Sequence, residues 1–167
     1  MAGMVWCVLD WIRFGKPTTL GMITGCIAGL AAVTPGAGFV ALNGALWISA
    51  IAGLVCWLSV TAFKAKYAYD DSLDAFGVHG IGGIWGTIAA GIWATKTVNP
   101  NGVDGLIYGN PMQLWIQLKA TGITMAYSFV VSLALFWIVD KIVTLRVNEH
   151  DERIGLDLTQ HREAGYT

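Results

Sequence analysis

The chain has 167 residues, of which 55% are apolar and only 13% are charged. Ordinary soluble domains contain about 25% charged residues, so this chain has too little polar surface to cover a water-soluble globule. Its net charge of −1, without a clustered basic patch, argues against nucleic acid as a partner, because phosphates are bound by clustered Lys and Arg.

Five apolar segments follow one another along the chain, at residues 1–12, 18–33, 39–63, 75–95 and 120–139. The first lacks the basic start of a signal peptide and is typical of the end of a spanning helix. The third is long enough to cross a bilayer with some tilt, and residues 113–119 extend the fifth outward. We therefore predict an all-α integral membrane protein, a polytopic helical bundle with about four complete transmembrane helices plus the end of a fifth.

Basic residues are distributed unevenly over the connections between these segments. If each segment crosses once, one side receives Arg13, Lys16, Lys64, Lys66, Lys141, Arg146, Arg153 and Arg162. The other side receives only Lys96 and Lys119, so the positive-inside rule makes the first side cytoplasmic. We predict a transmembrane region over residues 1–141 and a cytoplasmic C-terminal tail over residues 142–167, in a multi-pass protein of the plasma or inner cell membrane.

Small residues recur at every fourth position in two of the segments, as Gly21, Gly25 and Gly29, as Gly82, Gly86 and Ala90, and as Gly83, Thr87 and Gly91. This spacing puts the small residues on one helix face and lets another backbone approach closely. Glycine costs about 1 kcal/mol of helix propensity relative to alanine in water. Its repetition therefore favours tight helix packing, with a ligand role as the alternative.

The second segment ends at Thr34-Pro35-Gly36-Ala37-Gly38, on the predicted external side. Pro35 cannot continue the backbone hydrogen bonding, and it disfavours helical geometry at Thr34. The stretch is either a plain turn or a broken helix end whose free carbonyls and Thr34 hydroxyl face a polar solute.

His79 is the one basic or acidic side chain inside the core of the predicted spanning segments. Ionisable groups are costly in hydrocarbon, so they usually face the bundle interior or a cavity. Imidazole can hold and pass a proton near neutral pH, so we favour a functional role over a buried histidine satisfied by one neighbouring hydroxyl. Asp74, five residues earlier, is expected to cap this helix. Space beside the imidazole is expected from Gly77, Gly80, Gly82 and Gly83.

The other histidines, His150 and His161, lie in the predicted tail. Five aspartates lie near the predicted cytoplasmic boundary, namely Asp10, Asp70, Asp71, Asp74 and Asp140. Metal or nucleophilic chemistry needs more partners than His79 alone, so we predict neither an enzyme nor a catalytic, metal or cofactor site. A membrane enzyme remains an alternative only if further ionisable residues lie upstream. The tail is either disordered or docks through its apolar residues and responds to a soluble partner.

Three stretches carry a recognisable pattern: GCIAGLAAVTP at residues 25–35, DAFGVHGIGG at 74–83 and ERIGLDLTQHREAGY at 152–166. They resemble the G-x-x-A-G-L-V-x-I-T-P, D-x-F-x-x-H-G-x-x-G and E-x-x-G-L-D-x-x-x-H-x-E-x-x-Y signatures of the Amt/Mep/Rh ammonium transporter family. The form of the tail is similar to that of the Amt branch. Arg162 departs from the pattern, because it stands where glycine is common.

The resemblance implies a fold of eleven helices in a homotrimer with one pore per subunit, of which this chain covers roughly the last two-fifths. It matches His79 to the second of two pore histidines, whose partner would lie upstream of Met1, and Thr34 to a position near the outer pore mouth. By motif position, the residues that the resemblance implies to support the pore helix are Asp74, Phe76, Gly80 and Gly83. A regulatory tail is implied for Gly155, Asp157, His161, Glu163 and Tyr166.

The implied function is transport of ammonium, which crosses a dry hydrophobic pore as ammonia. Such a pore refuses hydrated sodium and potassium, because it offers no substitute for their hydration shells. The chain is then a fragment that should not conduct alone, since half a bundle exposes its pore wall. The implied partners are ammonium or ammonia, the lipid bilayer and a soluble PII-type signal protein. The alternative is an ammonium sensor or regulatory membrane protein that signals through its tail.

Overall fold

The structure, a computed structural model, describes residues 1–165, and the predicted tail residue Tyr166 lies outside the described residues. The elements are α1 (Ala2–Phe14), α2 (Thr19–Val33), η1 (Thr34–Gly36), α3 (Leu42–Leu58), η2 (Ser59–Phe63), α4 (Lys64–Tyr67), η3 (Phe76–Gly80), α5 (Ile81–Trp93), η4 (Leu106–Tyr108), α6 (Pro111–Ile142), α7 (Glu149–Ile154) and η5 (Asp157–His161). Within the described part of the chain, the only β pairing is a single bridge between Val40 and Ala94.

Three helical stretches are long and apolar enough to cross a membrane, namely Thr19–Gly36, Leu42–Tyr67 and Pro111–Ile142. A further apolar helix forms where η3 runs directly into α5. These helices confirm the prediction of an all-α membrane protein. The chain divides into two compact units, Met1–Ile123 and Thr124–Thr167, so the predicted border between residues 141 and 142 stays a prediction.

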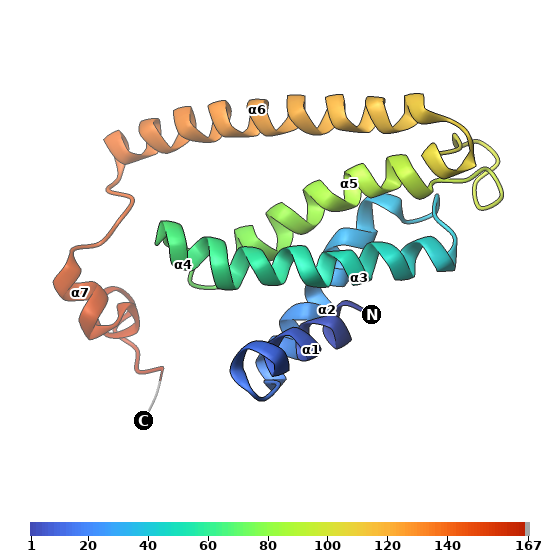
Figure 1. Ribbon diagram of the computed structural model, residues 1–167. Coiled ribbons are helices and arrows are strands. Elements are labelled where there is room, and N and C mark those ends of the chain that lie inside the picture. The colour runs from blue at the N-terminus through green and yellow to red at the C-terminus, as the bar shows by residue number, and fades with distance from the viewer. Residues whose placement is uncertain (166–167) are drawn as a thin grey trace. The chain divides into compact units, whose positions relative to one another are not determined.

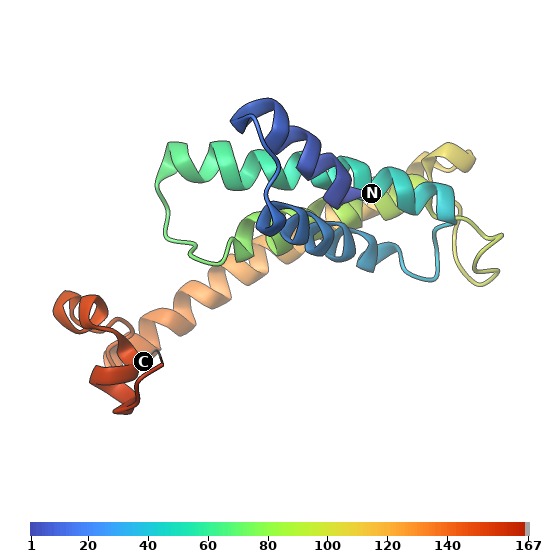
Figure 2. The same cartoon turned by 90° about the horizontal axis from the view of Figure 1, so that it is seen from below.

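In the first unit, α2 and α5 run in the same direction and lie side by side (Figure 1 and Figure 2). Gly82 faces the carbonyl of Ala28, and Gly86, one turn further along α5, faces Ala32, one turn further along α2. When each segment crosses the bilayer once, two spanning helices with one spanning helix between them in the sequence run in the same direction. The packing therefore agrees with the alternation assumed for the basic residues.

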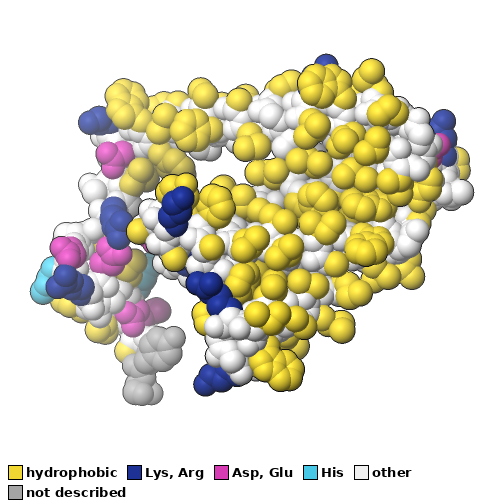
Figure 3. All heavy atoms as spheres, viewed as in Figure 1, with side chains coloured by type: hydrophobic (Ala, Val, Ile, Leu, Met, Phe, Trp, Pro, Cys, Tyr) yellow, Lys and Arg dark blue, Asp and Glu magenta, His cyan; other side chains and the backbone are white. Residues whose placement is uncertain are grey.

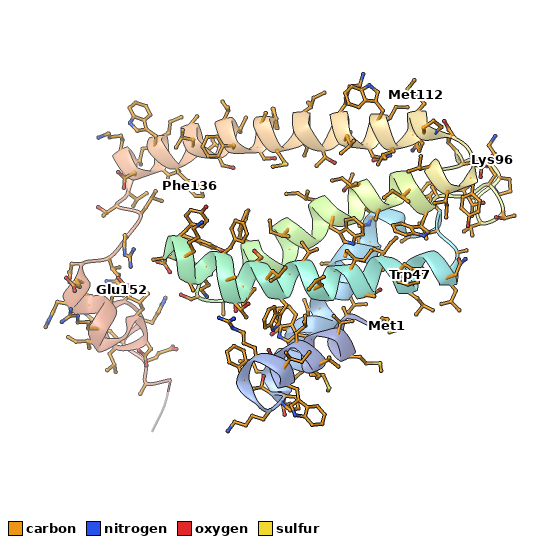
Figure 4. All side chains as sticks on the ribbon, viewed as in Figure 1. Met1, Trp47, Lys96, Met112, Phe136 and Glu152 are labelled. Atoms are coloured by element: carbon orange, nitrogen blue, oxygen red, sulfur yellow. The ribbon has the colours of Figure 1, made fainter. Side chains whose placement is uncertain are left out.

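Helix α3, which lies between α2 and α5 in the sequence, runs in the opposite direction and packs against both. Its C-terminal part meets the start of α5, where Cys56 packs beside Gly82. Its N-terminal part meets the far end of α5, where Gly44 packs against the side chain of Trp93. Lys96, in the loop that follows α5 (Figure 4), lies at the opposite end of the unit from α4 (Figure 1).

The first glycine stripe packs against α1, as the spacing by four predicts. A Cβ added at Gly25 would lie only 2.7 Å from the Cβ of Trp6, and one added at Gly29 would lie 2.8 Å from the Cβ of Ala2. These contacts confirm tight helix packing for this stripe and give it no ligand role. Small residues let helix backbones approach closely, which is the main source of helix association in lipid.

The buried core of the first unit consists mainly of alanines, together with Trp6, Trp57 and Val78. The largest side chains that are fully buried are Ile48 and Cys56. Large apolar side chains instead cover the outside of the helices (Figure 3). Along the whole of α6 no residue is buried among the described ones. An exposed apolar surface of this extent marks a membrane or partner contact rather than a surface facing water.

Candidate functional site

The helix that carries His79 begins with a cap from Asp71. One oxygen of its carboxylate accepts the backbone N–H of Ala75 at 2.8 Å, and the other accepts those of Phe76 at 3.0 Å and Gly77 at 3.4 Å. Asp74 does not cap the helix, so that prediction is wrong. Its carboxylate instead accepts a hydrogen bond from the ammonium of Lys64 at 2.6 Å. The turn at Ser72 and Leu73 brings Asp71, and not Asp74, over the free N–H groups.

Replacing Asp71 with alanine is expected to loosen the first turn before His79 and to cost about 1 kcal/mol of helix stability, the typical value of a lost N-cap. Hydrogen exchange of the amides of Ala75, Phe76 and Gly77 measures the effect directly. The matched control is Asp74→Ala, which removes a carboxylate of the same loop but no acceptor of these amides. Equal acceleration of exchange in both variants would contradict the assignment of the cap.

One face of this helix is packed against α3 and its π-helical continuation η2. A Cβ added at Gly77 would lie 2.7 Å from Cγ2 of Val60. Val78 is only 3% exposed, and its carbonyl accepts a weak hydrogen bond from the thiol of Cys56 at 3.8 Å. Gly77 and Gly82 therefore serve helix packing, and they do not provide the expected space beside the His79 imidazole.

The opposite face is open. His79 is exposed, and its imidazole has no hydrogen-bond partner among residues 1–165. A Cβ added at Gly83, one turn further on, would meet nothing within 4 Å. Phe76 covers Gly80 with its own ring and also lies on the exposed side. The alternative of a buried histidine bonded to a neighbouring hydroxyl thus does not hold within the described chain.

Phe76 borders an apolar pocket of about 400 Å³ between the end of α3 and the start of α5. The ring of Tyr69 meets the Phe76 ring edge to face, with centroids 6.0 Å apart. The Tyr69 hydroxyl is buried and has no partner among the described residues. The sequence did not single out Tyr69, because a tyrosine in a polar connection carries no distinctive signal.

Thr34 lies at the other end of the helix bundle from His79. Its φ and ψ of −52° and −47° are helical, so the prediction that Pro35 drives it out of helical geometry is wrong; η1 continues α2 as a short 3₁₀ turn instead. The Thr34 hydroxyl donates to the carbonyl of Leu30 at 2.7 Å. Gly86 packs on Ala32, which puts Thr34 about 10 Å or more beyond His79 along the axis of α5.

In the second unit, the tail residues fold into a compact turn around Asp157. Its carboxylate accepts the backbone N–H of Gly165 at 2.9 Å, and its carbonyl accepts that of Glu163 at 2.8 Å. Gly155 has a φ of 113° and Arg162 a φ of 54°. A glycine is favoured where φ is positive, so Arg162 occupies a backbone conformation that suits glycine better. The tail is therefore structured, with α7 and η5 as its helices.

Hydrogen bonds from the Gly165 and Leu158 amides hold the pKa of the Asp157 carboxyl below its usual range. Because this carboxyl is more acidic in the folded turn, its stabilisation is present above about pH 4, the usual value for Asp. It is lost as the pH falls through the lower folded pKa. We expect the Gly165 amide resonance to follow this titration with a midpoint below pH 4, and Asp157→Asn to abolish it. A midpoint at or above pH 4 would contradict the claim that the Gly165 hydrogen bond lowers the pKa of Asp157.

Comparisons with known proteins show which family the chain resembles. Residues 1–166 match the model of the Ammonium Transporter Family. The chain is 52% identical over 167 residues to the ammonium transporter Amt1 of Archaeoglobus fulgidus, covering 100% of this chain and 42% of that protein. It is 47% identical over 161 residues to an ammonium transporter of Bacillus subtilis, covering 96% of this chain and 40% of that protein.

A solved structure is also similar. The crystal structure of Saccharomyces cerevisiae Mep2 superposes with a TM-score of 0.85 at 34% identity, over 95% of this chain and 37% of that one. The chain thus spans about two-fifths of the length of the relatives that it matches. Because the family model matches nearly all of its residues and its helices superpose on a member's structure, the chain belongs to the Ammonium Transporter Family.

Proposed function

We propose that the chain supplies one wall of a pore through which ammonium-derived ammonia crosses the membrane, with His79 as the group that faces the solute. The single observation that carries the proposal is the open face of the η3–α5 helix. On this face an unpartnered imidazole stands next to a glycine that leaves room beside it. An imidazole in an apolar channel can accept a proton at one nitrogen and donate one from the other, so it can orient ammonia and relay a proton.

Facing residues from the rest of a longer protein would complete this pore. The open face offers a surface that such a segment would cover, and we propose that the chain by itself does not conduct. Assembly as a homotrimer, which the family resemblance implies, belongs to the same proposal. The matched relatives are named transporters, which confirms the expectation that the chain is not an enzyme and does not favour the sensor alternative.

The proposed orientation places the C-terminal tail in the cytoplasm of a cell bounded by the plasma or inner membrane. The eight-to-two distribution of basic residues supports it, and so do the alternating helix directions of the first unit. We propose that the structured turn around Asp157 offers a surface to a soluble PII-type signal protein. Residues Gly155, His161 and Glu163 belong to that turn.

The test is a chimera in which this chain replaces the matching 42% of the Archaeoglobus fulgidus transporter. The 52% identity over the whole chain makes the new helix contacts conservative. Reconstituted into liposomes, the chimera is expected to pass ammonium and to exclude potassium, while this chain alone passes neither. The parent archaeal protein is the positive control. A chimera that assembles like the parent but carries no ammonium flux would overturn the proposed function.

A further inference from the structure

Asp10, on α1, is the only charged side chain that is buried among residues 1–165, with 4% of its surface exposed. A buried carboxylate is expensive unless hydrogen bonds satisfy it, and an apolar side chain of the same size would often give equal or better stability. The proposed transport function makes no use of Asp10. Its position therefore calls for another physical reason.

The two oxygens of the Asp10 carboxylate tie together three helices. Oδ1 accepts the indole N–H of Trp57 on α3 at 2.8 Å. Oδ2 accepts the hydroxyl of Thr18 at 3.2 Å, and the Thr18 hydroxyl in turn caps α2 by accepting the backbone N–H of Gly21 at 2.9 Å. The guanidinium of Arg13 lies 6.0 Å from the Trp57 ring, where it restrains the indole from one face.

Trp57 connects the hydrogen-bonded Asp10 carboxylate to the helix that carries His79. Trp57, Cys56 and Val78 belong to one buried cluster, and Val78 directly precedes His79. The thiol of Cys56 donates to the Val78 carbonyl at 3.8 Å. Val60, three residues beyond Trp57, packs on the same cluster and against Gly77. Two consecutive residues before His79 thus rest on the segment that Trp57 anchors.

We propose that Asp10 is a positioning residue. By holding the Trp57 indole it fixes the position of Val78, and the position of Val78 determines the direction in which the His79 imidazole points. A shift of the indole would move the packed face of η3, and the ring on the opposite face would turn with it. The consequence for ion selectivity rests on the proposed function. The effect of Asp10 on the direction of the imidazole does not rest on that function, so the structural claim and the transport claim can be tested separately.

The structural step is tested on the full 167-residue chain in lipid nanodiscs, with ¹⁵N-labelled histidine. The imidazole resonances of His150 and His161, in the tail, serve as internal references. Asp10→Leu and Trp57→Phe are expected to shift the His79 resonances and to leave the two references in place. Asp10→Asn is expected to restore the wild-type His79 resonances, because its amide oxygen can still accept from Trp57 and its amide nitrogen can donate to Thr18.

Ile48→Ala is the matched control, because it damages the separate core cluster near the other end of α5. It should lower the unfolding temperature without moving the His79 resonances. The proposal is overturned if Asp10→Leu and Trp57→Phe leave His79 unchanged, if Ile48→Ala moves it equally, or if Asp10→Asn behaves like Asp10→Leu. Should Asp10→Leu fail to fold, the milder Trp57→Phe decides.

The transport step uses the chimera with the archaeal N-terminal part. Trp57→Phe is expected to change the ratio of ammonium to potassium flux several-fold, and Asp10→Asn to leave it near the unmodified value. If the unmodified chimera carries no ammonium, the proposed function fails while the resonance experiment still decides the role of Asp10. If the chimera transports ammonium but Trp57→Phe leaves both the flux ratio and the His79 resonances unchanged, only the positioning role fails.

Discussion

Replacing Gly86 with alanine is expected to destabilise the helix bundle by about 3 kcal/mol, at the upper end of the usual range for overpacking. An added Cβ would overlap the carbonyl oxygen of Ala32 and lie 3.1 Å from its Cα. Both are backbone atoms, so no side-chain rotation can relieve the clash. Helix α2 must move away from α5, which separates the small-residue contacts that hold the two together. Unfolding of the chain in mixed micelles by increasing detergent fraction measures the change.

Gly83→Ala is the matched control on the same helix. Its added Cβ meets nothing within 4 Å, so only helix propensity acts, and the variant should be as stable as the wild type or up to about 1 kcal/mol more stable. The two substitutions are only three residues apart. If they change the free energy of unfolding in opposite directions, the close approach of α2, and not the glycine content of α5, limits stability. Equal destabilisation by both variants would count against the parallel packing of α2 and α5.

Replacing His79 with alanine in the chimera is expected to change the ratio of ammonium to potassium flux about tenfold or more, the effect of losing about 1.4 kcal/mol of differential stabilisation in the pore. Assembly should persist, because His79 is exposed and its imidazole has no hydrogen-bond partner among residues 1–165, so its removal leaves the packed Gly77 and Val78 face intact. Liposome flux measurements with each cation, together with the oligomeric state of the purified variant, give both readouts.

Two further variants sharpen this experiment. His79→Gln keeps a hydrogen-bonding side chain but cannot be protonated near neutral pH, so it separates orientation of the solute from proton relay. His150→Ala removes an exposed tail histidine and should leave the flux ratio unchanged. If His79→Ala conducts with unaltered flux and selectivity, His79 has no role in the pore and the open face must be a packing surface alone.

The predictable features are those that depend on local pattern. Long uncharged segments predicted the helical membrane class, since lipid offers the backbone no hydrogen-bond partners and forces each segment to satisfy its own. The spacing of Gly21, Gly25 and Gly29 correctly indicated a close helix contact. His79 could be singled out from sequence because an ionisable group among apolar residues is rare in a membrane helix.

Features that depend on chain reversal or on distant contacts were not predictable. The cap on the His79 helix comes from Asp71 and not from Asp74, because the turn geometry decides which carboxylate reaches the free N–H groups. Glycines beside His79 look equivalent along the chain, yet Gly77 packs on Val60 while Gly83 faces open space.

The sequence by itself determined that this is a helical membrane protein with a histidine in an apolar segment, because composition and periodicity act within single helices. Only the tertiary structure decided which face of that helix is open and which carboxylate is buried. Asp10 lies 47 residues from Trp57 along the chain, and no local sequence pattern predicts a hydrogen bond between residues so far apart. Burial is a property of the assembled helices, since it depends on which surfaces the distant segments cover.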